Sequence, residues 1–224
     1  MSFSPRMEIL PPAQRRLWPN LKPASALGFV LYRGTAIALR LGHRASIDFD
    51  FFLEKPLNRT AISAAFPFLA SATVLLDERE TLTALIAAAD GATSPVKVSF
   101  FGMIGFGRVG VPEFTDDRVL QVASLDDLMA TKVKVVLKRA EAKDYLDIAA
   151  MASAGVSLAK GLASAREIYG PNFQPSESLK ALVYFADGDL AALAGTAKAT
   201  LIESVSAVRT LPHVKILSRQ LSSE

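Results

Sequence analysis

The chain has 224 residues, enough for one domain of ordinary size or two small ones. Half of the residues are hydrophobic and 21% are charged, which is the composition of a packed globular protein rather than a disordered chain. The absence of cysteine excludes disulfides, thiolate metal sites and cysteine nucleophiles. With only two histidines, we do not expect a zinc site built from histidines. We therefore expect any bound metal to be a hard cation held by carboxylates, Mg²⁺ or Mn²⁺.

The net charge and the apolar pattern limit which partners and which cellular location we expect. A net charge of +3 is mildly basic, which is compatible with a nucleotide or nucleic-acid partner without establishing one. No apolar stretch approaches the roughly 18–20 residues that cross a bilayer, and residues 1–6 lack the pattern of a signal peptide. We expect a cytoplasmic protein with no membrane partner.

The first half of the chain predicts a small mixed sheet with flanking helices. A strand at 28–32 runs into Gly34 and Thr35, and Thr35 is predicted to cap a helix at 36–41. The other predicted elements are a lead-in helix or turn at 11–22, a helix at 59–70 and strands at 72–76, 82–88 and 96–101. A turn-rich stretch at 102–117 is expected to link this part to the rest.

Residues 47–52 alternate acidic and apolar side chains, which predicts a strand with one polar face. Asp48 and Asp50 are two positions apart and therefore project from the same face. The apolar side chains are expected to enter the core: Ile47, Phe49 and Phe51. Two carboxylates so close repel each other unless a divalent cation lies between them or one is protonated. This arrangement suits Mg²⁺ held against a triphosphate, and a solvated acidic strand face is the alternative.

The second half of the chain predicts helices only. Ser124 is expected to cap a long helix at 125–140. Shorter helices are predicted at 144–153, 158–168, 176–186 and 190–207. The expected fold class is therefore α+β, with an α/β domain at 1–117 and a helical domain at 118–224.

Two segments resemble motifs of the AbiEii-type nucleotidyltransferase toxins, which serve in abortive infection and type IV toxin–antitoxin systems. The first motif is carried by Arg-Gly-Thr-Ala-Ile-Ala-Leu at 33–39 and Gly-His-Arg-Ala-Ser-Ile-Asp-Phe-Asp-Phe-Phe at 42–52. The second is carried by Leu-Met-Ala-Thr-Lys-Val-Lys at 128–134, by Arg139 and by Lys-Asp-Tyr-Leu-Asp at 143–147. The resemblance implies a polymerase-β-like nucleotidyltransferase fold, whose helical half completes the active site.

The resemblance also implies a role for individual residues. It places four of them in the triphosphate pocket: Gly34, Thr35, Arg44 and Ser46. It assigns Asp48 and Asp50 to the metal, Lys132 to phosphate and Asp144 to the role of base or extra ligand, with Asp147 as the last acid of the signature. The implied reaction is Mg²⁺-dependent transfer of a nucleoside monophosphate from a nucleoside triphosphate to RNA, such as the 3′ end of a transfer RNA, or to a protein hydroxyl. The implied partner is a cognate antitoxin protein.

The residues around Lys132 and Asp144 carry their own signals. Lys132 shares a predicted helix face with Leu128 and Val136, so its ammonium needs a partner or a route to solvent. Asp144 and Asp147 are three positions apart and can face one site. Alternatively, Asp147 and Lys143 form an ordinary surface ion pair.

Two departures from the family pattern support other readings. Arg33 stands where the family usually has glycine in the first turn, and Ser99 stands where many nucleotidyltransferases carry a third carboxylate. They motivate the alternative of a catalytically degenerate nucleotidyltransferase fold that binds a nucleotide or a partner. The basic run at 132–143 motivates a further alternative, nucleic-acid binding without chemistry. The spacing of Gly105, Gly107 and Gly110 fits a dinucleotide-binding loop, but no helix is predicted to follow it.

Overall fold

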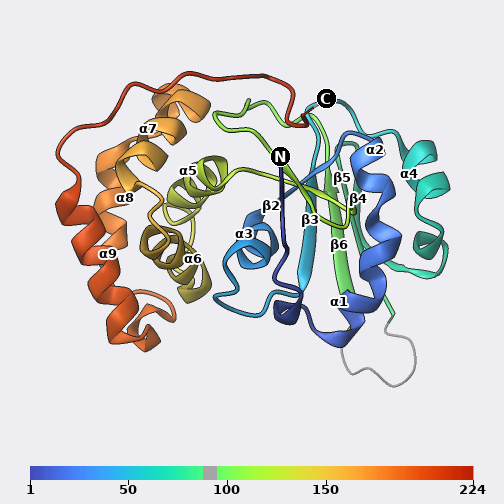
Figure 1. Cartoon of the computed structure of the whole chain (residues 1–224), viewed down its shortest axis with the longest axis horizontal. Coiled ribbons are helices and arrows are strands. Elements are labelled where there is room, and N and C mark those ends of the chain that lie inside the picture. Colours follow the sequence, from blue (N-terminus) through green and yellow to red (C-terminus); the bar gives the residue numbers. More distant parts are fainter. Residues whose placement is uncertain (88–94, 224) are drawn as a thin grey trace. The chain divides into compact units, whose positions relative to one another are not determined.

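The computed structural model describes residues 1–87 and 95–223, and the chain divides into two compact units (Figure 1). Unit 1 comprises Met1–Gly107, Val111–Ala123 and Arg219–Glu224. Unit 2 comprises Arg108–Gly110 and Ser124–Ser218. The last residues of the chain therefore return to the unit in which it begins.

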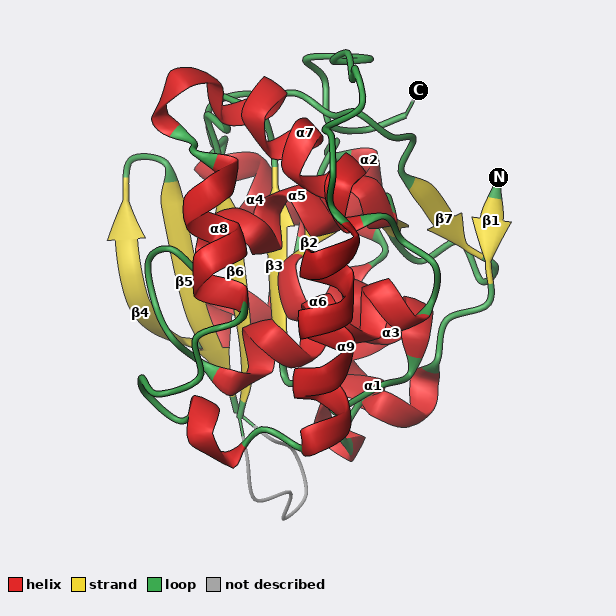
Figure 2. Cartoon of the chain, turned by 90° about the vertical axis from the view of Figure 1, so that its left-hand side faces the viewer, coloured by secondary structure: helices red, strands yellow, loops and turns green. Residues whose placement is uncertain are grey.

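The described residues of unit 1 form a mixed eight-stranded sheet with the order β1-β7-β8-β2-β3-β6-β5-β4. The strands are β1 (Ser2–Phe3), β2 (Val30–Tyr32), β3 (Asp48–Phe52), β4 (Thr73–Glu78), β5 (Thr81–Ile86), β6 (Val96–Phe101), β7 (Glu113–Thr115) and β8 (Gln121–Val122). The central strand β3 pairs antiparallel with β2 and parallel with β6. Strands β1 and β4 lie at opposite edges of the sheet (Figure 2).

Helices cover both faces of this sheet. They are α1 (Pro12–Leu17), α2 (Pro23–Ala26), α3 (Arg33–Leu41) and α4 (Arg59–Ala65), with 3₁₀ turns at Met7–Ile9, Trp18–Leu21 and Pro67–Ser71. Helix α3 lies on one face, and α1, α2 and α4 lie on the other (Figure 1). Phe49 and Phe51 are fully buried, and the ring of Phe49 lies 6.2 Å from that of Trp18 between centroids. The apolar residues of β3 therefore form the core under α1 and the turn that follows it.

Three local expectations are corrected in unit 1. Helix α3 begins at Arg33 with Tyr32 as its N-cap, so Thr35 lies inside the first turn and does not cap it. The predicted helix at 59–70 is interrupted because Pro67 cannot continue a helix, and a 3₁₀ turn follows. Ile47 is 56% exposed because β3 begins one residue later, so its predicted place in the core is wrong.

Several strand boundaries in unit 1 differ from the predicted ones, because no local sequence signal marks them. The turn-rich stretch at 102–117 contains β7, and β1 and β8 have only two residues each. The strand predicted at 72–76 extends to Glu78, and the one predicted at 82–88 ends at Ile86, with Ala88 outside the described residues.

Unit 2 is helical. Its helices are α5 (Leu125–Val135), α6 (Ala142–Ser153), α7 (Leu158–Tyr169), α8 (Pro175–Leu182) and α9 (Gly195–Ala207), with 3₁₀ turns at Gly170–Asn172 and Leu190–Ala192. The predicted cap of α5 is confirmed, since the Ser124 hydroxyl accepts a hydrogen bond from the backbone N–H of Asp127. Helix α5 ends before residue 140, although no glycine or proline marks its end. In the part of the chain that the structure describes, no helix is long and apolar enough to cross a membrane.

Candidate functional site

The pairing of β3 with β6 gathers polar side chains on one face of the sheet in unit 1. Asp48 lies opposite Lys97 and Asp50 lies opposite Ser99, and residues in such register point to the same face. The Lys97 ammonium is 2.9 Å from a carboxylate oxygen of Asp48. The side chain of Asp48 is 35% exposed, so a ligand from solvent can reach it.

Asp50 is the more enclosed of the two carboxylates, with a side chain only 10% exposed. Burial raises the pKa of Asp50 above that of an ordinary aspartate, because the charged form is poorly solvated. The charges of Arg33 and Lys97 and a hydrogen bond with Ser99 oppose this rise, whereas the negative charge of Asp48 adds to it. The pair is thus a site at which additional positive charge is favourable.

Arg33 reaches Asp50 from the turn between β2 and α3. Tyr32 pairs with Asp50 across the two strands, so the next residue lies at the same end of the sheet. Arg33 has φ +64°, a left-handed conformation that costs a non-glycine residue about 1 kcal/mol. A glycine would adopt this conformation freely, and Arg33 adopts it nonetheless. Its guanidinium lies 4.5 Å from the ring centroid of Phe101 and 5.4 Å from that of Phe52.

Two predicted triphosphate residues, Thr35 and Ser46, contact each other beside Asp48. Their hydroxyl oxygens are 2.7 Å apart, and both side chains are buried. The Thr35 hydroxyl donates its one proton to the backbone carbonyl of Asp48, so the Ser46 hydroxyl must be the donor to Thr35. These bonds join the first turn of α3 to the start of β3.

The other two predicted triphosphate residues are in the same region of the chain. Gly34 lies in the first turn of α3, next to Thr35, and is half-buried. Arg44 lies in the loop between α3 and β3, where its guanidinium donates to the carbonyl of Ala45. The N-cap residue of α3, Tyr32, makes no side-chain capping hydrogen bond, so the first N–H groups of the helix are suited to an anion.

The donor set on β3 fits a metal that arrives with its own oxygen ligands. Among the described residues, no group of three or more His, Asp or Glu side chains could hold a metal ion. Asp48 and Asp50 supply hard oxygen donors from two residues. Mg²⁺ in phosphoryl-transfer sites is bound by one or two carboxylates, with phosphate and water oxygens completing its octahedron. The pair therefore fits Mg²⁺ or Mn²⁺ carried by a triphosphate, and does not resemble a closed protein cage.

The predicted residues of the second motif meet in unit 2. The Lys132 ammonium on α5 lies 2.5 Å from Asp144 and 2.6 Å from Asp147, which are both on α6 and fully buried. Arg139 donates to Asp144 from Nε at 2.8 Å. Burial alone would raise the pKa of Asp144, but the hydrogen bond from Arg139 and the charge of Lys132 hold it below the ordinary value. Asp144 is therefore ionised at neutral pH.

The contacts of this network decide between the alternative roles considered for Lys132 and Asp147. Lys132 is 4% exposed, so it meets buried partners and does not snorkel to solvent. Asp147 pairs with Lys132, whereas Lys143 pairs with Glu141 at 2.8 Å, so the surface pair of Lys143 with Asp147 is wrong.

The glycine pattern at Gly105, Gly107 and Gly110 has no dinucleotide-binding context, since β7 follows it where a helix would be needed. Gly110 has a packing reason instead. A Cβ at this position would lie 2.0 Å from the hydroxyl of Ser124.

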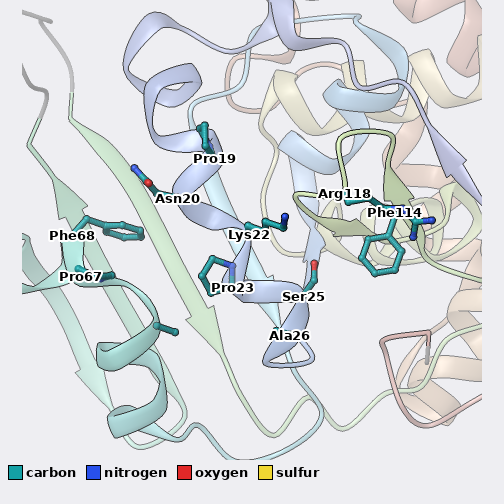
Figure 3. A pocket seen from close by; sticks show the side chains of 11 residues that line it. Pro19, Asn20, Lys22, Pro23, Ser25, Ala26, Pro67, Phe68, Phe114 and Arg118 are labelled. Carbon is teal, nitrogen blue, oxygen red and sulfur yellow. The ribbon is translucent and has the colours of Figure 1, made fainter.

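A pocket of about 890 Å³ lies elsewhere in unit 1 (Figure 3). Its lining includes Pro19, Lys22 and Phe68, from elements on the sheet face that bears Phe49. None of its eleven lining residues carries a carboxylate or is a predicted site residue. This hollow therefore offers no carboxylate to hold a metal, despite its size.

Lys97 is the residue of this site that sequence reasoning missed. The sequence predicts a strand at 96–101, but the partner strand and its register are not local properties. The contact of Arg33 with Asp50 was missed for the same reason.

Comparisons with known proteins agree on the class of fold. Residues 16–194 match the family model described as "Nucleotidyl transferase AbiEii toxin, Type IV TA system". An uncharacterized protein of Aquifex aeolicus (strain VF5) is 33% identical over 162 residues, which cover 71% of this chain and 74% of that protein. The solved structure of MenT4, a nucleotidyltransferase toxin of Mycobacterium tuberculosis H37Rv, aligns with a TM-score of 0.51 and 11% identity, over 85% of this chain and 82% of MenT4.

Proposed function

This chain belongs to the AbiEii family of nucleotidyltransferase toxins of type IV toxin–antitoxin systems, and we propose that Asp48 and Asp50 hold the metal for its reaction. A hydroxyl oxygen of the acceptor attacks the α-phosphorus of a nucleoside triphosphate, and the bond to pyrophosphate breaks. The hydroxyl proton passes to a base or to water. The observation that carries the proposal is the pair of carboxylates on one face of β3, beside the N-terminus of α3.

The residues of unit 1 divide this work. When bound, Mg²⁺ neutralises the triphosphate and lowers the pKa of the attacking hydroxyl. Asp48 and Asp50 would hold the metal in a fixed position, because both lie on the central strand β3. The backbone N–H groups of Gly34 and Thr35 donate hydrogen bonds to phosphate oxygens, and Arg44 and Ser46 position the triphosphate. Thr35 and Ser46 also hold the backbone at the start of β3, where Asp48 lies.

Lys132 and Asp144 enter the proposal through their match to the second family motif. Lys132 is assigned to the phosphates, and Asp144 to the role of base or extra ligand. Their ion pair favours an ionised carboxylate at Asp144, which is the state that a base or a metal ligand requires.

The proposed acceptor is RNA, such as the 3′ end of a transfer RNA, or a protein hydroxyl, and the proposed partner is a cognate antitoxin. The net charge of +3 supports an acidic acceptor such as RNA. Modification of either acceptor arrests growth, and the antitoxin relieves that arrest.

The test is transfer of label from each of the four α-labelled nucleoside triphosphates to total cellular RNA and protein. Mg²⁺-dependent labelling is expected with wild type, and a loss of at least about a hundredfold is expected with Asp48→Asn. The labelled fraction identifies the acceptor class. Asp126→Asn, a change of a partly exposed aspartate on α5, serves as the matched control and should label like wild type.

A second candidate, a degenerate fold that binds nucleotide without chemistry, is favoured by one observation. Arg33 and Lys97 already neutralise both carboxylates of the pair. If folded wild-type protein labels nothing with any nucleotide, but binds a triphosphate, this second candidate replaces the first.

A further inference from the structure

Arg33 combines features that a turn residue alone does not need. Its backbone has φ +64°, where glycine would avoid any steric cost. Its side chain is half exposed, yet it lies over the rings of Phe52 and Phe101 and reaches Asp50. An arginine at a position whose backbone favours glycine points to a task for its guanidinium.

The contact between Arg33 and Asp50 is a loose one. Nη1 lies 3.2 Å from one oxygen of Asp50, longer than the roughly 2.7–2.9 Å of a strong charge-assisted hydrogen bond. The Lys132 contacts in unit 2 are shorter, at 2.5 and 2.6 Å, and both partners there are buried. The bond joins a half-exposed guanidinium to a buried carboxylate. Water can solvate the released guanidinium, but Asp50 needs another cation in its place, so Arg33 exchanges only when such a cation arrives.

The two aromatic rings give Arg33 a second attachment. A guanidinium over the faces of Phe52 and Phe101 is attracted by the rings without using its N–H donors. Release of Asp50 therefore leaves the guanidinium close to the carboxylate pair, with its donors directed to another anion.

We propose that Arg33 is a displaceable counter-ion, which competes with the divalent cation for Asp50 and then binds the triphosphate that accompanies this cation. The inference rests on the proposed function, since it needs metal and triphosphate at the Asp48–Asp50 pair. A divalent cation brings more charge to Asp50 than a single guanidinium does, and a phosphate offers Arg33 the geometry for two parallel hydrogen bonds. The exchange leaves each anion with a cation: Asp50 with the metal and the phosphate with Arg33.

The test compares binding of two probes, Mn²⁺ alone and inorganic tripolyphosphate with Mn²⁺. Arg33→Gly is expected to bind Mn²⁺ alone roughly fivefold more tightly than wild type, because the competitor is gone. The same variant is expected to bind tripolyphosphate roughly fivefold more weakly, because the phosphate ligand is gone. Water-proton relaxation measures the first affinity and calorimetry the second.

Arg118→Gly is the matched control. Arg118 also has positive φ, at +59°, is exposed, and lies over an aromatic ring, Phe114, at 5.1 Å. It is absent from the contacts of Asp48 and Asp50, so Arg118→Gly should match wild type for both probes. Cooperative thermal unfolding well above the assay temperature verifies that both glycine variants are folded.

Opposite changes for the two probes are specific to a displaceable counter-ion, since a merely structural role would weaken both or neither. Unchanged or weaker Mn²⁺ binding by Arg33→Gly overturns the competition, and unchanged tripolyphosphate binding overturns the phosphate contact. An Mn²⁺ affinity that is the same for Asp48→Asn and for wild type instead overturns the metal site of the proposed function. The two failures are therefore distinguishable.

Discussion

At the scale of single residues, metal binding and burial have opposite effects on the charge of Asp50. A metal ligand must be ionised, but the side chain of Asp50 is largely buried and its pKa is raised above the ordinary value by that burial. Because the folded pKa exceeds the unfolded one, the ionised carboxylate costs stability at all pH values above the folded pKa. This cost is absent below the unfolded pKa of about 3.9, where both states are protonated.

We therefore expect Asp50→Asn to melt a few degrees higher than wild type at pH 7, with a difference that shrinks as the pH falls toward 4. The amide retains an acceptor for Arg33 but carries no charge that needs solvation. Thermal unfolding at several pH values measures the difference. A lower melting temperature for Asp50→Asn at pH 7 would contradict this account of the site. Asp48→Asn, at a more exposed carboxylate, should stay within about 0.5 kcal/mol of wild type.

At the scale of elements, buried charges hold α5 against α6 in unit 2. Lys132 and Arg139 contribute two positive charges, and Asp144 and Asp147 contribute two negative ones. A balanced network of this kind tolerates burial, whereas removal of one partner leaves an uncompensated charge without water. The second family motif is therefore structural in unit 2, whatever it adds to the reaction.

Removal of the central cation tests this role. Lys132→Met leaves two buried carboxylates with one arginine. We therefore expect its free energy of unfolding, measured with urea, to be about 3–5 kcal/mol lower than that of wild type. Lys143→Met removes a half-exposed lysine paired with Glu141, and should change stability by less than about 0.5 kcal/mol. Equal effects of the two variants would refute the network as a determinant of stability.

The same network predicts a pH dependence. The folded pKa of Asp144 lies below its unfolded value, so its contribution to stability is complete above the unfolded pKa and is lost as the pH falls through the folded pKa. The stability difference between wild type and Asp144→Asn should be constant from pH 8 to about pH 5 and should shrink below about pH 4. Urea unfolding across this range measures it. A difference that persists unchanged to pH 3 would show that charge at Asp144 is not the cause.

Which elements the sequence predicts depends on whether their signal is local. The acidic strand at β3 and the Ser124 cap of α5 have patterns contained in a few residues, and the structure confirms both. Thr35 has the chemistry of a helix cap, but the helix begins two residues earlier and uses its hydroxyl to hold Asp48 instead. Strand β1 exists because the distant β7 pairs with it, which no local pattern can indicate.

At the scale of the whole molecule, the sequence predicts the family, an α/β unit and a helical unit, and the structure and the comparisons confirm that class of fold. It places Asp48 and Asp50 on one face because strand alternation is local. It does not predict that Lys97 and Arg33 contact them, because these contacts depend on strand register and on the backbone of a turn. The counter-ions of the two carboxylates, Lys97 and Arg33, are therefore harder to predict from sequence than the carboxylates themselves.

The central claim is that Asp48 and Asp50 hold a divalent cation against a triphosphate. Its most direct test is anomalous diffraction from crystals grown with Mn²⁺ and a nucleoside triphosphate analogue that cannot be cleaved at the α-phosphorus. The predicted result is an Mn²⁺ peak within about 2.0–2.3 Å of one oxygen from each carboxylate, with phosphate oxygens completing the shell and Arg33 released from Asp50. A nucleotide bound elsewhere, or an Mn²⁺ peak remote from both carboxylates, would contradict it.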